Sequence, residues 1–95
     1  MTNLEFASRL TSALIAADRK ESAAEVKAKR RPNVYRLGHY LHAAELTQIA
    51  LETGASQTEA FVEHFTATRE MHSVARQLGL AIGVQAGRWM VAAGV

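Results

Sequence analysis

Four histidines and one neighbouring glutamate are the residues of this sequence best suited to bind a metal ion. His39, His42 and Glu45 follow one another at intervals of three. The other two histidines, His64 and His72, are eight residues apart. On a helix that rises about 1.5 Å per residue, His39 and Glu45 are about 9 Å apart along the axis, and His64 and His72 are about 12 Å apart. Both separations are too large for one zinc ion with bonds near ~2 Å. The spacing therefore predicts no metal ligand within one helix and leaves open a pair from two helices, such as His42 with His64.

Catalytic motifs are not found elsewhere. The chain has no cysteine, no serine in the setting of a nucleophile elbow, and no glycine loop of the phosphate-binding type after a strand. The carboxylate pairs Glu59/Glu63 and Glu63/Glu70 fall on the polar side of a predicted helix, which is usually a solvated surface. We therefore expect no enzymatic activity and no cofactor.

A run of basic residues around the only proline, Pro32, could contact phosphates. It holds Lys27, Lys29, Arg30, Arg31 and Arg36, with Tyr35 placed to stack on a base. The same charges also suit the carbonyl-rich end of a helix, where Lys and Arg are favoured without any ligand. Residues 27–36 are therefore predicted to join two helices and to be the leading place for nucleic acid or another acidic partner.

Residues 46–65, "LTQIALETGASQTEAFVEHF", resemble a helix-turn-helix. Ala50, Gly54 and Ser56 stand at the right relative positions. Ala60 and Glu63 occupy positions where that motif has branched or apolar residues. Residues 74–89 also resemble a helix-turn-helix in part, through Ala75 and Gly79. Their later apolar residues do not fall at the positions where that motif has them. A short turn between two helices is predicted in any case.

The predicted fold is a small all-α bundle of three main helices, over about 3–31, 33–53 and 57–93, of which the last one is long. Helix-favouring residues dominate, and no strand-like alternation of β-branched residues is present. Thr2 with Glu5 forms a capping box at the start of the first helix, and Ser22 with Glu25 could mark a kink or break within it. The first helix should stop by Arg31, because a residue before proline disfavours the α region.

The second helix carries two apolar faces and ends at Gly54. Its main face consists of Leu37, Tyr40, Leu41, Ala44, Gln48 and Leu51. A narrower face is formed by Tyr35, Leu46 and Ile49. A helix with two apolar faces usually lies between two neighbours.

The third helix should open at a capping box, Ser56 with Glu59, and be amphipathic as far as Leu78. Residues 78–95 are then apolar almost all round, and glycine recurs every four residues at 79, 83 and 87. This tail could be the centre of the protein's own bundle, pack against another protein or copy, or enter a bilayer. A bilayer span needs ~20 apolar residues, whereas this segment has eighteen and includes Arg88. We favour an intermolecular contact, through Leu80, Gly83, Val84, Gly87, Trp89, Met90 and Val91.

Composition fits one helical domain over residues 1–95, which holds 48% hydrophobic and 21% charged residues. Residues 1–38 contain eight Lys/Arg and four Asp/Glu, and residues 39–95 contain three and five, so the two parts carry +4 and −2. The first ten residues lack the basic and apolar regions of a signal peptide. We expect a cytoplasmic protein of a bacterium or of a virus-infected host, with one basic end.

Residues 33–48, "NVYRLGHYLHAAELTQ", resemble in style the small helical accessory proteins of phages and prophages. The function expected from the sequence is therefore a non-catalytic protein–protein interaction module, an adaptor, inhibitor or assembly subunit that packs through its C-terminal helix. The alternative is a nucleic-acid-binding protein that uses the basic segment 27–36 and the helix-turn-helix-like hairpin 46–65.

Overall fold

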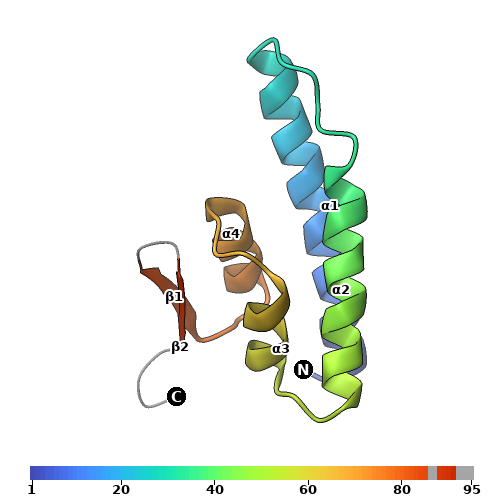
Figure 1. Cartoon of the computed structure of the whole chain (residues 1–95), viewed down its shortest axis with the longest axis vertical. Coiled ribbons are helices and arrows are strands. Elements are labelled where there is room, and N and C mark those ends of the chain that lie inside the picture. The colour runs from blue at the N-terminus through green and yellow to red at the C-terminus, as the bar shows by residue number, and fades with distance from the viewer. Residues whose placement is uncertain (86–87, 92–95) are drawn as a thin grey trace.

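The computed structural model describes residues 1–85 and 88–91. Four helices follow one another, α1 (Asn3–Lys27), α2 (Arg36–Glu52), α3 (Gln57–His64) and α4 (Arg69–Gln77), and a two-stranded antiparallel sheet of β1 (Ile82–Gln85) and β2 (Arg88–Val91) comes after them (Figure 1). Helices thus predominate, as predicted. The prediction of three main helices with a long last one is wrong, because the first helix is the longest.

Helices α1 and α2 form an antiparallel hairpin that is longer than the rest of the molecule (Figure 1). Helices α3 and α4 and the sheet pack beside its lower half only. The upper half projects as an arm, here defined as residues 15–44. The radius of gyration is 13.7 Å and the longest extent is 43 Å, against about 12 Å for a compact domain of this length.

The hydrophobic core lies where α1, α2, α3 and α4 meet. Phe6, Leu10 and Leu14 line one face of α1 at intervals of four, and all three are buried. The other elements contribute Leu51, Ala60, Phe61, Phe65, Met71, Val74, Ala75 and Leu78. This core contains the large apolar side chains that stabilise the fold, since burial of each contributes ~2 kcal/mol.

The helix starts follow the predicted caps. The Oγ1 atom of Thr2 accepts a hydrogen bond from Glu5 N at 3.1 Å, and the Oγ of Ser56 accepts one from Glu59 N at 3.1 Å. The break considered at Ser22 and Glu25 does not occur, because α1 continues as one helix to Lys27. Both residues instead contact Arg36 of α2.

The predicted helix 57–93 is interrupted at residues 65–68 and ends at Gln77. Phe65 has an extended backbone, and the Oγ1 atom of Thr68 accepts a hydrogen bond from Met71 N at 3.2 Å, so that Thr68 starts α4 as its N-cap. Gly79, with φ of 70°, then ends α4. Beyond it, β-branched and aromatic residues pair in two strands, with Ile82 opposite Val91 and Val84 opposite Trp89.

Candidate interaction surfaces

Arg36, predicted to contact phosphate, is engaged inside the arm. Its guanidinium group pairs with Asp18 and Glu21 at 3.5 Å each and donates a hydrogen bond to Glu25. This hydrogen bond is the main reason that the pKa of Glu25 is lowered and that of Arg36 is raised. The side chain of Arg36 is only 13% exposed, so it holds α1 and α2 together and is not free to bind a ligand.

Tyr40 extends the same polar network. Its hydroxyl donates a hydrogen bond of 2.7 Å to Glu21. Burial, together with this bond to a carboxylate, raises the pKa of the Tyr40 hydroxyl above its ordinary value. Three carboxylates of α1, those of Asp18, Glu21 and Glu25, are thereby turned toward α2.

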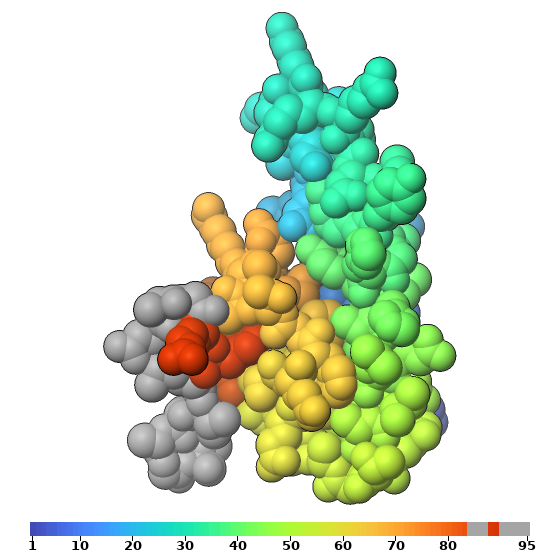
Figure 2. Space-filling model, in the orientation of Figure 1, coloured from blue at the N-terminus to red at the C-terminus, as the bar shows by residue number. Residues whose placement is uncertain are grey.

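The remaining basic residues of the predicted segment form the end of the arm. We call Lys27, Lys29, Arg30 and Arg31 the basic tip. All four are exposed, and none has a carboxylate within 4.0 Å in the part of the chain that the structure describes. Figure 2 shows this segment standing out into solvent at one end of the long axis. Tyr35 follows it with 73% of its surface exposed.

The turn that presents the basic tip is fixed by backbone hydrogen bonds. Arg30 N donates to Glu25 O at 2.8 Å, and Lys29 N donates to Val26 O at 3.0 Å. This pair of bonds is a Schellman motif, with Lys29 in the left-handed region at φ 59°. On the far side of Pro32, the Oδ1 atom of Asn33 accepts a hydrogen bond from Tyr35 N at 3.0 Å and leads into α2.

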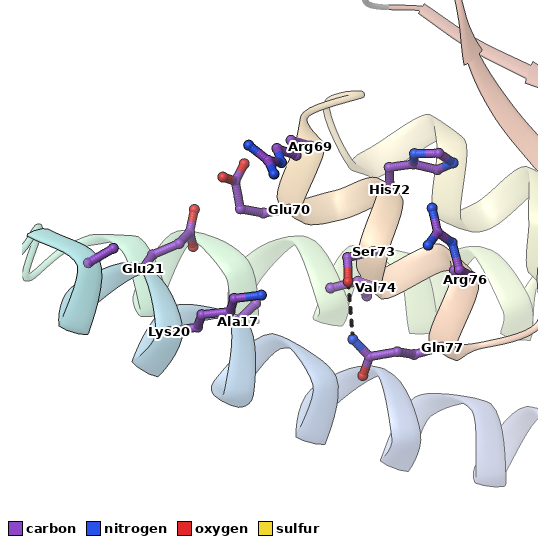
Figure 3. Close-up of a pocket in the computed structure, with 11 residues that line it drawn as sticks. Ala17, Lys20, Glu21, Arg69, Glu70, His72, Ser73, Val74, Arg76 and Gln77 are labelled. Atoms are coloured by element: carbon purple, nitrogen blue, oxygen red, sulfur yellow. Dashed lines mark hydrogen bonds between the residues drawn. The ribbon is translucent and has the colours of Figure 1, made fainter.

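A second basic surface lies on α4 and was not predicted. Arg69, His72 and Arg76, here called the basic row, are spaced by three and four residues and therefore lie on one side of the helix. The opposite side of α4 is buried in the core. Figure 3 shows Arg69, His72 and Arg76 at the outer border of a cleft between α4 and α1, whereas Gln77 reaches toward α1.

A cleft of 640 Å³ separates α4 from the arm. Lys20, Glu21 and Ala24 line it from α1, and the basic row lines it from α4 together with Glu70 and Gln77 (Figure 3). The cleft is open to solvent, and its lining mixes apolar side chains with charges of both signs. The excess of positive charge lies on its α4 side, where Arg69 and Arg76 outnumber Glu70, whereas Lys20 and Glu21 balance on the α1 side.

The predicted helix-turn-helix at 46–65 corresponds to α2, a short turn and α3. Gly54, with φ of 101°, makes the turn. The outward positions of α3 hold Glu59 and Glu63, both exposed. Two carboxylates on the presumed recognition helix would repel phosphates, so this hairpin is a poor surface for nucleic acid.

The predicted C-terminal interface lies on strands and a loop instead of a helix. Leu80 and Trp89 are half-buried against the protein's own core. The indole Nε1 of Trp89 donates a hydrogen bond of 2.6 Å to Phe65 O, and its ring packs edge-on against Phe61 with centroids 5.5 Å apart. Gly83 lies in β1. Gly87 and the side chains of Val84, Met90 and Val91 lie outside the described residues.

The narrower apolar face predicted on α2 is solvent-exposed. We call Tyr35, His39, His42, Leu46 and Ile49 the outer face of α2. Leu46 is 37% exposed and Ile49 is 50% exposed. The opposite side of α2, including Thr47 and Leu51, is buried against the core. The prediction that α2 lies between two neighbours is thus met on one side only in the part of the chain described here.

The histidines are distributed over three separate surfaces. His42 lies 4.0 Å from Glu45 on exposed α2, and the Nδ1 atom of His64 lies 2.9 Å from Ala60 O on its own helix. His72 belongs to the basic row. In residues 1–85 and 88–91, no three side chains of the metal-binding types gather around one point.

Neither the family models nor the known proteins and solved structures compared with this chain gave a match. No described helix is both long and apolar enough to cross a lipid bilayer.

Proposed function

We propose that this chain is a non-catalytic nucleic-acid-binding protein whose contact surface combines the basic tip with the basic row of α4. The observation that carries the proposal is the sorting of charge on the arm. The carboxylates of Asp18, Glu21 and Glu25 face α2 and share Arg36, whereas the cations of the basic tip face solvent. A phosphate backbone can therefore approach the tip without meeting these three carboxylates directly.

The basic row adds the second part of the surface. Arginine side chains donate to phosphates or to guanine edges, and histidine and serine can also hydrogen-bond to bases. Arg69 and Arg76 are exposed, and neither has a carboxylate within 4.0 Å among the described residues. The other side of α4 is anchored in the core by Met71 and Val74, so the basic row is held on a rigid element.

The two parts lie close enough to act on one nucleic acid. The cleft beside α4 reaches Ala24 of α1, close to the end of that helix at Lys27. Lys27, the first residue of the basic tip, lies three residues after Ala24 on the same helix, about 4.5 Å along its axis. A backbone with one charge per ~1.7 Å of duplex axis can place phosphates against both parts at once.

The salt dependence of binding tests this proposal. We expect a DNA duplex to bind at low salt, with an affinity that falls steeply as salt rises. The double variants Arg30→Ser/Arg31→Ser and Arg69→Ser/Arg76→Ser should each lower the slope of log affinity against log salt by about 1.8, since one phosphate contact accounts for ~0.9. A mobility-shift titration at several salt concentrations measures this.

Arg19→Glu is the matched control, because it changes net charge by the same two units. Arg19 is exposed on α1 but belongs to neither the basic tip nor the cleft. This variant should keep most of the slope. Equal losses in all three variants would mean that only net charge matters, and absence of binding at low salt would refute the proposal.

A protein–protein interaction module is the second candidate function. The outer face of α2 favours it, because Tyr35 and Ile49 expose half or more of their surface on a helix whose other side is buried. The apolar helix predicted over the C-terminal residues does not support this function, because α4 ends at Gln77 and two strands follow it. The partner would then bind α2 and not the C-terminal segment.

A further inference from the structure

The cleft between α4 and α1 combines a cationic border with an apolar lining. The basic row stands at its outer border (Figure 3). Its lining also includes Ala17, which is half-buried on α1, and Val74, which is buried on α4. The volume of 640 Å³ falls within the range of about 300–1,000 Å³ that small-molecule sites have. A flat, partly apolar group attached to an anionic backbone therefore suits both parts of the cleft.

Hydrogen-bonding groups lie in the same cleft. Glu21 lines it from α1, and Glu70 and Gln77 line it from α4. Burial, the hydrogen bond to Glu21 and the charges of Glu21 and Glu70 all raise the pKa of the Tyr40 hydroxyl, so both carboxylates lie near it. Tyr40 and Arg36 contact Glu21 through its Oε2 atom. Glu70 has no cation within 4.0 Å among the described residues, so its carboxylate is available to a ligand.

We propose that this cleft takes one unpaired base of a single-stranded nucleic acid whose phosphates lie along the basic row. The inference rests on the proposed function and names its substrate class. Bases inside a duplex are stacked and paired, so they cannot enter a cleft between two helices, whereas an unpaired base can turn out of its strand. The guanidinium groups of Arg69 and Arg76 can stack on such a base at the border of the cleft.

The carboxylate of Glu70 selects bases that carry an exocyclic amino group. An ionised carboxylate accepts hydrogen bonds and donates none. Cytosine offers the N4 amino group, which protein carboxylates accept from, whereas thymine presents the acceptor O4 in its place. Thymine beside Glu70 would therefore leave two acceptors facing each other, and we expect cytosine to bind more tightly.

Fluorescence anisotropy with oligo-dC and oligo-dT tests this preference. The two strands carry the same charge, and a length of about 15 nucleotides suits one small domain. We expect oligo-dC to bind about fivefold more tightly, the low end for one specific base contact. Glu70→Gln should reduce this ratio to less than about twofold, because an amide can turn either its donor or its acceptor to the base. Glu63→Gln is the matched control, since it makes the same charge change at an exposed position of α3 outside the cleft.

Filling the cleft tests the site without changing charge. Ala24→Leu places a larger side chain in the lining, and Ala23→Leu is its matched control, because both alanines are exposed on α1 and only Ala24 lines the cleft. Ala24→Leu should weaken oligo-dC binding about fivefold, the value of the lost base contact. It should leave duplex binding within about twofold, because the phosphate contacts remain. Ala23→Leu should change neither.

The possible results separate this inference from the proposed function. Equal affinities of the wild type for oligo-dC and oligo-dT, or equal effects of Ala24→Leu and Ala23→Leu, would overturn the base site. Salt-dependent binding of the duplex would still support the proposed function in that case. Absence of binding to both single strands and to the duplex at low salt would overturn both. Circular dichroism confirms that each variant is folded.

Discussion

Lys29 has a backbone conformation, φ 59°, that glycine tolerates and most other residues do not. Helices α1, α2 and α4 all end in the same pair of backbone hydrogen bonds, the Schellman motif described above for α1. The residue after the C-cap is Lys29 in α1, Gly54 in α2 and Gly79 in α4. The positive φ of 101° at Gly54 and 70° at Gly79 suits glycine. The turn of the basic tip is therefore the one helix end of the three that carries backbone strain.

Replacing Lys29 by glycine should stabilise the protein. The change removes the contact between Cβ and the backbone in the left-handed region, which costs roughly 1–2 kcal/mol, and part of that gain is offset by the greater freedom of glycine in the unfolded chain. We expect Lys29→Gly to raise the free energy of unfolding by about 0.5–1 kcal/mol in a urea titration. Lys29→Ala, which loses the same charge and keeps the strain, should not; equal effects of both would contradict the explanation.

At this scale the sequence predicted most helix starts and missed one. Thr2 and Ser56 cap helices as expected, because a hydroxyl residue three positions before a glutamate forms a recognisable pattern. Thr68 caps α4 without that pattern, since Met71 stands where a glutamate would be. Ser22 and Glu25 show the pattern inside a continuous helix, because Arg36 supplies a tertiary partner that no local pattern reveals.

At the scale of elements, the arm depends on polar contacts, since the buried large apolar residues lie below it. Arg36 should therefore matter more to α1 and α2 there than any single apolar side chain. Arg36→Met leaves Asp18, Glu21 and Glu25 without their cation, and we expect it to destabilise the arm by about 2 kcal/mol. Amide hydrogen exchange should rise in residues 15–44 and change little in α3.

Acid should remove this difference between variant and wild type. The pKa of Glu25 is lowered in the folded protein, mainly by its hydrogen bond with Arg36, so its contribution to stability is present above the unfolded value of about 4.3 and is lost as pH falls through the folded value. Unfolding of both proteins at pH 7 and at pH 3 measures this. A gap that persists undiminished at pH 3 would show that Arg36 acts through packing alone.

Trp89 should anchor the C-terminal sheet to the helices. Trp89→Phe removes the hydrogen bond to Phe65 O and keeps an aromatic ring near Phe61. Loss of a half-buried hydrogen bond should lower the free energy of unfolding by about 1–2 kcal/mol, as followed by circular dichroism. Arg88→Gln, on the same strand but exposed, should leave stability within ~0.5 kcal/mol. An unchanged stability of Trp89→Phe would mean that the sheet is not coupled to the core.

The third predicted helix was wrong because its periodicity survives the break. The four residues 65–68 are nearly one helical turn of 3.6 residues, so the apolar positions of α4 stay in phase with those of α3. Phe61, Met71 and Leu78 therefore fall on one predicted stripe although two helices carry them. The tail was misread for a related reason: a short, wholly apolar run fits a buried helix or a strand equally well, and only Ile82, Val84 and Trp89 favoured strands.

At the scale of the whole molecule, composition predicted a mostly helical chain and a basic end but not where charge would be accessible. Arg36 counted toward the predicted phosphate site, yet the register of α1 against α2 places it among three carboxylates. The basic row went unnoticed because Arg69, His72 and Arg76 are not adjacent in sequence. The surface proposed here therefore depends on tertiary contacts that the charge balance of a segment does not report.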